Sequence, residues 1–174
     1  MKNLILVSGD IIENSNNYDV EAIVNPANEY MEDGGGVCGA IYDKAGAKQL
    51  ETYCHNKWND IMQVNEVRVT TGFSLCKDII HIHPPRAYEE ENRIEKLKDS
   101  YIKVFESIKK EKYKSVIIPS LGTGHYGYNH KEVAKIVINL LTCFCNDNDI
   151  TIVFNLFEEE TKYIYQEYLK KNAH

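Results

Sequence analysis

The 174-residue chain contains only 5 cysteines and no pair of them in C-x-x-C spacing. They stand at scattered positions, namely Cys38, Cys54, Cys76, Cys143 and Cys145. An odd, scattered set argues against a disulfide framework and is typical of proteins in a reducing compartment. We therefore expect a cytoplasmic protein, and we interpret Cys143 and Cys145 as packing residues.

Long hydrophobic runs are also absent from the sequence. The N-terminal apolar run, residues 4–7, stops at Ser8 and is too short for the core of a signal peptide or for a membrane span. We interpret it as a buried strand and expect no membrane partner.

Proline is scarce, and no repeat, low-complexity segment or linker interrupts the chain. The 4 prolines, Pro26, Pro84, Pro85 and Pro119, follow apolar runs, as is typical of strand ends rather than of a hinge between domains. The chain is long enough for one domain with a hydrophobic core. We predict a single domain over residues 1–174 and expect a monomer.

The chain has no excess of positive charge. Lys and Arg number 20 and Asp and Glu 26, which gives a net charge of −6. This balance disfavours DNA or RNA as a partner, because such binding depends on neutralising phosphates. It still allows one small anionic ligand, since backbone N–H groups can bind phosphate without basic side chains.

Short apolar runs alternate with helical patterns along the chain. The apolar runs, several of them typical of strands buried on both faces, cover residues 4–7, 22–24, 67–70, 79–82, 116–118 and 150–154. Apolar residues recur at helical spacing near 94–108, 133–144 and 164–169, and a further helix is expected to start near Gly36 and to break at Gly46. The alternation predicts a three-layer α/β/α sandwich with a largely parallel sheet, whose ligands bind where strands end.

Two segments at strand ends carry candidate base contacts. Gly9 permits an unusual backbone angle after the first strand, and Asp10 could accept a hydrogen bond from an exocyclic amine or cap a helix. Phe157 follows the last strand and could stack on a base or belong to the core, which is the commoner place for Phe.

A glycine run lies between a strand and a helix. Asn25 and Asn28 precede it, and their amides suit sugar hydroxyls. Gly34, Gly35 and Gly36 would let backbone amides approach a ligand, and the helix that follows attracts negative charge at its start. The segment is neither a Walker loop nor a G-x-G-x-x-G fingerprint.

A second glycine loop follows the strand near residues 116–118. It runs Ser120-Leu121-Gly122-Thr123-Gly124-His125-Tyr126 and offers hydroxyls and an aromatic side chain. Two such loops on one small domain suit the two ends of a diphosphate.

The series G-D-I, V-N-P-A-N, G-G-G-V-C-G-A-I and I-P-S-L-G-T-G-H-Y-G-Y, in this order, resembles the macrodomain family of the MacroD-like and viral type. The resemblance covers the chain from about Val7 to Phe157. It implies an α/β/α sandwich on a mixed six-stranded sheet, and ADP-ribose, free or attached to a protein, as the ligand. It implies no cofactor.

The resemblance also implies roles for individual residues. Asp10 and Ile11 would read the adenine, with Phe157 packed on it. Asn28, Gly35 and Tyr126 would form the catalytic part of the site at the distal ribose. The remaining ligand contacts would come from Asn25, Gly34, Gly36, Val37, Cys38, Ser120, Leu121, Gly122, Thr123, Gly124 and His125.

The sequence departs from the family pattern at two places. Many relatives carry an aspartate tied to catalysis where Cys38 stands, and a neutral thiol is a poor base. We interpret Cys38 as a small ligand contact, with a covalent nucleophile as the alternative. His81 and His83 lie near Cys76, but the signature of the zinc-containing subclass is not recognisable, so we predict structural histidines and no metal.

The hypothesis that follows is an ADP-ribosyl hydrolase. It would release mono-ADP-ribose from acidic side chains of a modified protein, or cleave O-acetyl-ADP-ribose, by positioning and electrostatics. Two alternatives stay open: a non-catalytic ADP-ribose reader, which the missing aspartate favours, and a phosphatase acting on ADP-ribose 1″-phosphate.

Overall fold

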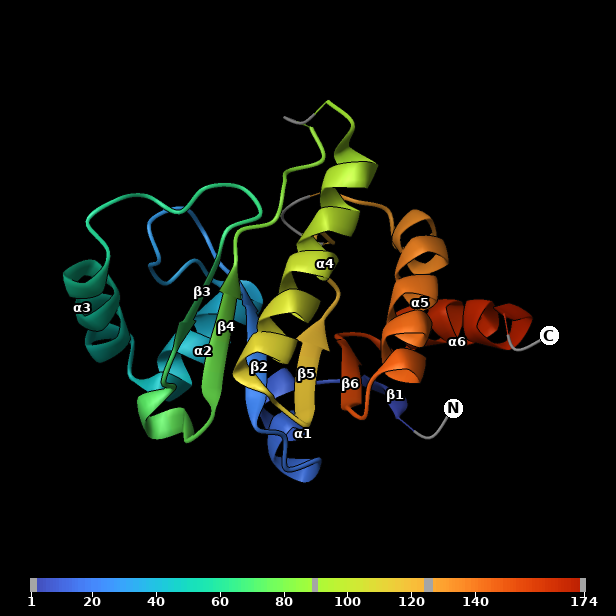
Figure 1. Cartoon of the computed structure of the whole chain (residues 1–174), viewed down its shortest axis with the longest axis horizontal. Coiled ribbons are helices and arrows are strands. Elements are labelled where there is room, and N and C mark those ends of the chain that lie inside the picture. The colour runs from blue at the N-terminus through green and yellow to red at the C-terminus, as the bar shows by residue number, and fades with distance from the viewer. Residues whose placement is uncertain (1–2, 89–90, 124–126, 173–174) are drawn as a thin grey trace.

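A six-stranded sheet forms the centre of the computed structural model, which describes residues 3–88, 91–123 and 127–172 (Figure 1). Its strands lie in the order β1-β6-β5-β2-β4-β3. Only β3 runs antiparallel to its neighbour, so the sheet is mixed and largely parallel. The strands are β1 (Leu4–Ser8), β2 (Ala22–Pro26), β3 (Val67–Thr70), β4 (Asp78–Ile82), β5 (Ser115–Pro119) and β6 (Thr151–Leu156).

The central strands are hydrophobic without alternation because both of their faces are covered. In β5, Val116 and Ile118 belong to the core on one side of the sheet, and Ile117 belongs to the core on the other side. All three side chains are fully buried. Hydrophobic burial on both faces therefore fixes these segments as strands.

Helices cover the two faces as two separate layers (Figure 1). One layer contains α1 (Ile11–Asn17), α2 (Gly36–Ala45) and α3 (Ala47–Lys57), and the other contains α4 (Arg93–Glu111), α5 (His130–Asp147) and α6 (Glu159–Asn172). A short 3-10 helix, η1 (Phe73–Leu75), precedes β4. Within the described ranges, no helix is both long enough and apolar enough to cross a membrane.

The predicted fold class, an α/β/α sandwich on a mixed six-stranded sheet, is confirmed. The predicted break at Gly46 is confirmed as well, because Gly46 adopts φ 98° between α2 and α3. Helix α1 was not predicted. It has 7 residues and buries only Ile11 and Ser15, so its sequence carries no long apolar stripe.

The sheet topology opens a crevice between two neighbouring strands. From β2 the chain continues into α2 on one face, and from β5 it continues into α5 on the other face. When the loops after two neighbouring parallel strands turn toward opposite faces of the sheet, a crevice opens between them, and α/β proteins bind ligands in this crevice. The site is therefore expected above the ends of β2 and β5.

Gly46 gives a test of this account of the fold. A Cβ at Gly46 would meet no atom closer than 3.8 Å, so Gly46→Ala changes the backbone energy and not the packing. We expect the free energy of unfolding in urea to fall by about 1–2 kcal/mol, the cost of a left-handed backbone with a side chain. Lys48→Ala, at an exposed site two residues further along the chain, is the control. Equal stability of Gly46→Ala and wild type would contradict the assigned conformation.

Candidate functional site

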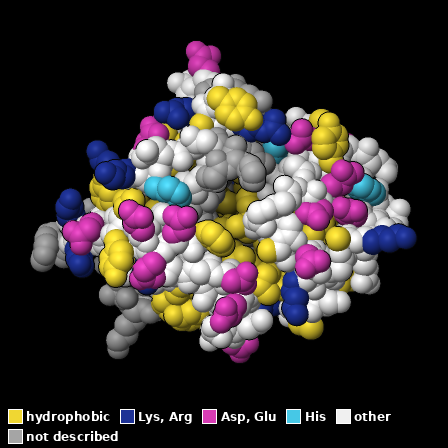
Figure 2. All heavy atoms as spheres, turned by 180° about the vertical axis from the view of Figure 1, so that it is seen from behind, with side chains coloured by type: hydrophobic (Ala, Val, Ile, Leu, Met, Phe, Trp, Pro, Cys, Tyr) yellow, Lys and Arg dark blue, Asp and Glu magenta, His cyan; other side chains and the backbone are white. Residues whose placement is uncertain are grey.

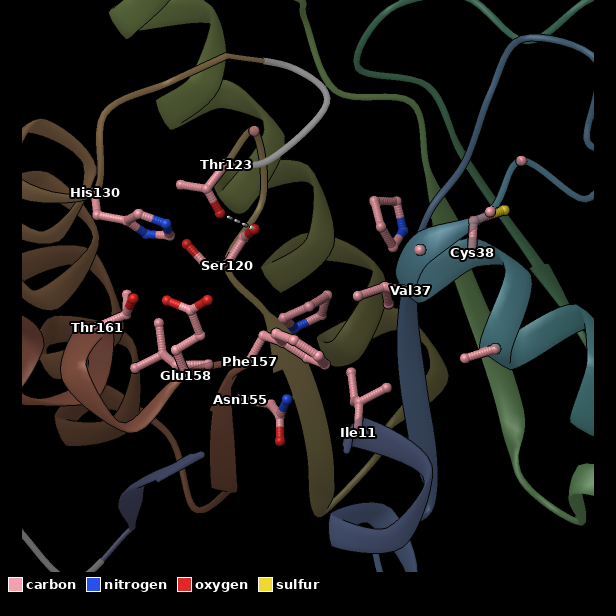
Figure 3. Close-up of a pocket in the computed structure, with 18 of the residues that line it drawn as sticks. Ile11, Val37, Cys38, Ser120, Thr123, His130, Asn155, Phe157, Glu158 and Thr161 are labelled. Carbon is pink, nitrogen blue, oxygen red and sulfur yellow. Dashed lines mark hydrogen bonds between the residues drawn. The ribbon is translucent and has the colours of Figure 1, made fainter. Parts of the chain in front are cut away.

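A cleft of about 860 Å³ lies at the carboxyl edge of the sheet, where the segments that follow β1, β2, β4, β5 and β6 meet. A hollow with hydrophobic side chains in its floor is visible in Figure 2, with Asp and Glu side chains gathered on both sides of it. Figure 3 shows side chains from several elements directed into the cleft. The residues that line the cleft include Asp10, Ile11, Asn28, Gly34, Gly35, Gly36, Val37, Cys38, Arg86, Tyr88, Ser120, Gly122, Thr123, His130, Asn155, Phe157, Glu158 and Thr161.

The end of the cleft at β1 and β6 is held by a tight turn. Gly9 adopts φ 104°, and its N–H donates to the carbonyl of Leu156 at 2.9 Å. Asp10 follows as the N-cap of α1, its Oδ1 accepting from the Glu13 N–H at 2.8 Å. Asp10 thus caps a helix and lines the cleft at the same time, so the two roles considered for it do not exclude each other.

Two asparagines fasten this turn to the last strand. Asn14 donates through Nδ2 to the Ser8 carbonyl at 3.0 Å and to Asn155 Oδ1 at 2.7 Å. Asn155 in turn donates to the Gly9 carbonyl at 3.1 Å. The pair fixes the ends of β1 and β6 relative to each other.

Phe157 is not a core residue, so that alternative is wrong. Its side chain is 79% exposed, although it comes directly after the buried strand β6. Figure 3 shows it in the cleft, with Val37 and Ile11 on one side of it. An exposed aromatic ring on the wall of a cleft is suited to stacking on a flat ligand.

The Asn28 carboxamide closes the loop that follows β2. Its Nδ2 donates to the Glu32 carbonyl at 2.7 Å, and its Oδ1 accepts from the backbone N–H groups of Tyr30 at 3.1 Å and Glu32 at 3.2 Å. Asn28 also lines the cleft. Asn28 therefore holds its own loop closed, and its side chain also forms part of the cleft wall.

The glycine run forms the start of α2. Gly35 and Gly36 adopt φ 77° and 55°, backbone angles that favour glycine. The N–H of Gly35, the N-cap residue, donates to Asp33 Oδ1 at 3.2 Å. The N-cap residue itself has no side chain to cap the N–H groups that follow, and the helix dipole favours an anion at this end. A Cβ at Gly34 would stand 3.0 Å from Asn28 Nδ2, so a side chain at this position would crowd the Asn28 amide.

Asn25 does not line the cleft. It lies beneath the cleft, in a row of buried polar side chains that contact one another. Its Nδ2 meets His81 Nδ1 at 3.0 Å, and His81 Nε2 meets Thr70 Oγ1 at 3.0 Å. Burial lowers the pKa of His81 to about 3, so the ring is neutral. This row joins β2, β4 and β3 below the loop that Asn28 closes, which gives Asn25 a supporting position.

Cys38 lies in the first turn of α2 and is buried, with its thiol 3.5 Å from the Glu32 carbonyl. Burial raises the pKa of this thiol, and hydrogen bonding to the Gly34 backbone and to Asn25 offsets only part of that effect. The thiol is therefore neutral near pH 7. A neutral, buried thiol suits a ligand contact better than a base or a nucleophile.

Two buried tyrosines hold the start of the second glycine loop. The Leu121 N–H donates to the Tyr101 hydroxyl at 2.9 Å, and Ser120 Oγ lies 2.8 Å from the Tyr165 hydroxyl. Gly122 adopts φ 80°, and a Cβ there would stand 2.7 Å from the Tyr128 ring. These contacts fix residues 120–123 over the end of β5, where Ser120, Gly122 and Thr123 line the cleft. Figure 3 shows Ser120 and Thr123 there.

Two residues predicted for the site do not line the cleft, and three others lie outside the residues that the structure describes. Leu121 is fully buried behind the loop, and Asn25 is buried as described above. Gly124, His125 and Tyr126 lie outside the described residues. The other predicted residues, from Asp10 to Phe157, are brought together around one cleft.

The structure adds cleft residues that the sequence did not single out. Arg86 and Tyr88 come from the segment after β4, and His130 and Thr161 come from α5 and α6. Asn155 and Glu158 flank Phe157. A signal for Arg86 existed, because the carboxyl end of β4 meets the same edge of the sheet as the ends of β2 and β5.

The two histidines near Cys76 make hydrogen bonds of their own. His81 is fully buried in the row described above, and His83 Nδ1 lies 3.0 Å from the Ala27 carbonyl. Among residues 3–88, 91–123 and 127–172, no three His, Cys, Asp or Glu side chains are grouped so that they could hold a metal ion.

Fold and cleft together define an α/β/α domain whose cleft is bounded by two glycine loops, an arrangement that suits a ligand carrying phosphates. Comparison with known proteins agrees with this class. The profile of the Macro domain family matches residues 24–137. The chain therefore belongs to the macro domain family.

Individual relatives cover nearly the whole chain. An O-acetyl-ADP-ribose deacetylase of Citrobacter rodentium is 31% identical over 88% of this chain and 90% of its own length. The Oceanobacillus iheyensis macrodomain with ADP superposes with a TM-score of 0.86 and is 34% identical, covering 97% of this chain and 90% of that one. A variant of the same macrodomain with ADPR gives a TM-score of 0.87 at 34% identity, covering 97% of this chain and 92% of that one.

The raised pKa of Cys38 predicts low reactivity toward iodoacetamide. At about pH 8.5, the ordinary pKa of a thiol, we expect the exposed Cys76 and Cys143 to be alkylated well before Cys38, as read by peptide mass spectrometry. Raising the pH through this range leaves Cys38 mostly a thiol, because burial raises its pKa. Labelling of Cys38 as fast as Cys76 would show an activated thiol instead.

Proposed function

We propose that this chain binds ADP-ribose in the cleft and hydrolyses ester-linked ADP-ribose, either on acidic side chains of modified proteins or in O-acetyl-ADP-ribose. The observation that carries the proposal is that the glycine run at residues 34–36, the start of the second glycine loop at residues 120–123, Asp10 and Phe157 all meet at one cleft. The names and ligands of the macro domain relatives support the same ligand class.

Each part of ADP-ribose has a counterpart among the cleft residues. The exposed ring of Phe157 offers a stacking surface to the adenine, and the Asp10 carboxylate offers an acceptor to its amino group. The uncapped start of α2 and the loop at Ser120–Thr123 offer backbone N–H groups to the diphosphate. The remaining part of the cleft, the loop that Asn28 closes, would contact the distal ribose.

Hydrolysis in this cleft would depend on positioning. At the start of α2, Cys38 is a neutral thiol, and the nearby Asp33 carboxylate accepts from the Gly35 N–H and is not among the residues that line the cleft. A water held between the bound diphosphate, the Asn28 loop and the α2 amides would then be the nucleophile, oriented rather than strongly deprotonated. Water supplies OH to one product and H to the other, so no further reactant is needed.

A second candidate, a reader that binds ADP-ribose without chemistry, is favoured by the same neutral Cys38. A protein mono-ADP-ribosylated on glutamate separates the two candidates. Release of ADP-ribose by wild type supports the hydrolase. Micromolar binding of ADP-ribose in calorimetry without any release from this substrate would decide for the reader.

Phe157→Ala tests the adenine end of the cleft. We expect the Kd for ADP-ribose to rise about 10-fold, because stacking of a base on an aromatic side chain contributes about 1–3 kcal/mol. Tyr163→Ala, which removes another exposed aromatic ring of the same region of the chain but not of the cleft, should leave the Kd unchanged. Equal affinity of Phe157→Ala and wild type would rule out the assigned stacking role.

Asn28→Ala tests the ribose end. It removes the three hydrogen bonds that close the loop, so we expect kcat on the glutamate-linked substrate to fall at least about 10-fold, since misplacement of reacting groups is costly. Asn56→Ala, at an exposed site on α3, is the matched control. Undiminished release by Asn28→Ala would contradict the proposed catalytic role.

A further inference from the structure

The order of strands in the sheet sets the order of the cleft segments. Along the edge the segments that line the cleft follow β1 and β6, then β5, then β2, and finally β4. If Phe157 and Asp10 take the adenine, the β5 loop the diphosphate and the Asn28 loop the distal ribose, one segment remains beyond the ribose. That segment contains Arg86 and Tyr88, which line the cleft.

The segment after β4 is fastened to the Asn28 loop. The Ala27 N–H donates to the Ile82 carbonyl at 2.8 Å, and His83 Nδ1 lies 3.0 Å from the Ala27 carbonyl. Arg86 also pairs with Glu29, the residue after Asn28, with 3.6 Å between Nη2 and Oε2. Arg86 therefore lies next to the loop assigned to the distal ribose.

Arg86 differs in charge from the rest of the cleft. Among the lining residues that the structure describes, it is the only Lys or Arg, and the ionisable carboxylates Asp10 and Glu158 belong to the opposite end at β1 and β6. Its side chain is 35% exposed and lines the cleft, and it also pairs with Glu29. A cation at one end of a cleft is suited to an anionic or oxygen-rich group.

We propose that Arg86 binds the acyl group of the substrate, and that it thereby selects ester-linked over arginine-linked ADP-ribose. This inference rests on the proposed function. In an acyl ester of the distal ribose, the acyl group extends from the ribose away from the diphosphate, into the space next to Arg86. Its carbonyl oxygen accepts from the guanidinium, whose planar donors match the two oxygens of a carboxylate.

The chemistry of ester hydrolysis makes this contact stronger as the reaction proceeds. The water oxygen bonds to the acyl carbon, and the bond between that carbon and the ribose oxygen breaks. One water proton passes to the ribose oxygen, which becomes a hydroxyl, and the acid product loses the other proton to solvent and leaves as a carboxylate. Negative charge thus appears on the oxygens that face Arg86. An arginine-linked substrate would instead bring a second guanidinium to this place, and like charges repel.

Binding measurements on Arg86→Ala test the inference. The probes are ADP-ribose and a hydrolysis-resistant analogue in which an acetyl group is joined to the distal ribose through an amide. We expect wild type to bind the analogue about 5-fold more tightly than ADP-ribose, as one additional hydrogen bond allows. Arg86→Ala should lose this advantage and bind ADP-ribose within about 2-fold of wild type, with Arg86→Lys in between.

Turnover gives the second readout. We expect kcat/KM on glutamate-linked ADP-ribose to fall about 10-fold or more in Arg86→Ala, because a hydrogen bond to a charged group contributes more than a neutral one. Arg93→Ala is the matched control, since Arg93 also pairs with a glutamate, Glu132, but does not line the cleft. It should keep both the preference for the analogue and the turnover.

The outcomes separate this inference from the proposed function. An unchanged preference for the analogue in Arg86→Ala would overturn the acyl role, and so would an equal loss of affinity for both probes, which would assign Arg86 to the diphosphate. A wild-type protein that binds neither probe would overturn the proposed function and this inference together. Binding without turnover would leave the analogue preference as the deciding measurement.

Discussion

The parallel arrangement of β1, β6, β5, β2 and β4 is the constraint on which the site depends. Parallel strands must all end at the same edge of a sheet, so five loops that are far apart in sequence meet there. Because β2 and β5 are neighbours whose chains leave toward opposite faces, their loops part and a cleft opens between them. The cleft follows from topology before any individual cleft residue is considered.

Buried polar groups then fix the loops at this edge. The Tyr101 and Tyr165 hydroxyls hold the start of the β5 loop, and the row from Asn25 through His81 to Thr70 lies under the β2 loop. Burial raises the pKa of both tyrosines, so they stay protonated and keep their hydrogen bonds through the physiological range. Polar groups are costly to bury unless they are paired, and here the pairing positions backbone amides at the cleft.

Much of this arrangement could be predicted from sequence, for identifiable reasons. Continuous apolar runs such as 116–118 indicate strands covered on both faces, and glycine runs at strand ends indicate close backbone approach to a ligand. Helix α1 could not be predicted, because it depends on the Asp10 cap and on contacts to β5 and β6 rather than on an apolar stripe.

The exposed ring of Phe157 and the place of Arg86 depend on tertiary structure. Phe is usually buried, and only the turn between β6 and α6 shows that this ring is left at the cleft. Arg86 is one of 20 Lys and Arg residues in the sequence, and its place after the strand predicted at 79–82 indicates a strand end but not a cleft. Its position becomes meaningful only when β4 is known to lie beside β2.

The state of Cys38 bears on what kind of chemistry this cleft can support. Since burial raises its pKa, the residue at the start of α2 supplies neither a base nor a thiolate near neutral pH. Rate enhancement in such a cleft must come from holding substrate and water in place and from stabilising charge that develops during the reaction. In the proposed mechanism the α2 amides would stabilise charge at the diphosphate, and Arg86 would stabilise it at the acyl group. Both groups are held in place by the fold, so this mechanism needs no carboxylate at the position of Cys38.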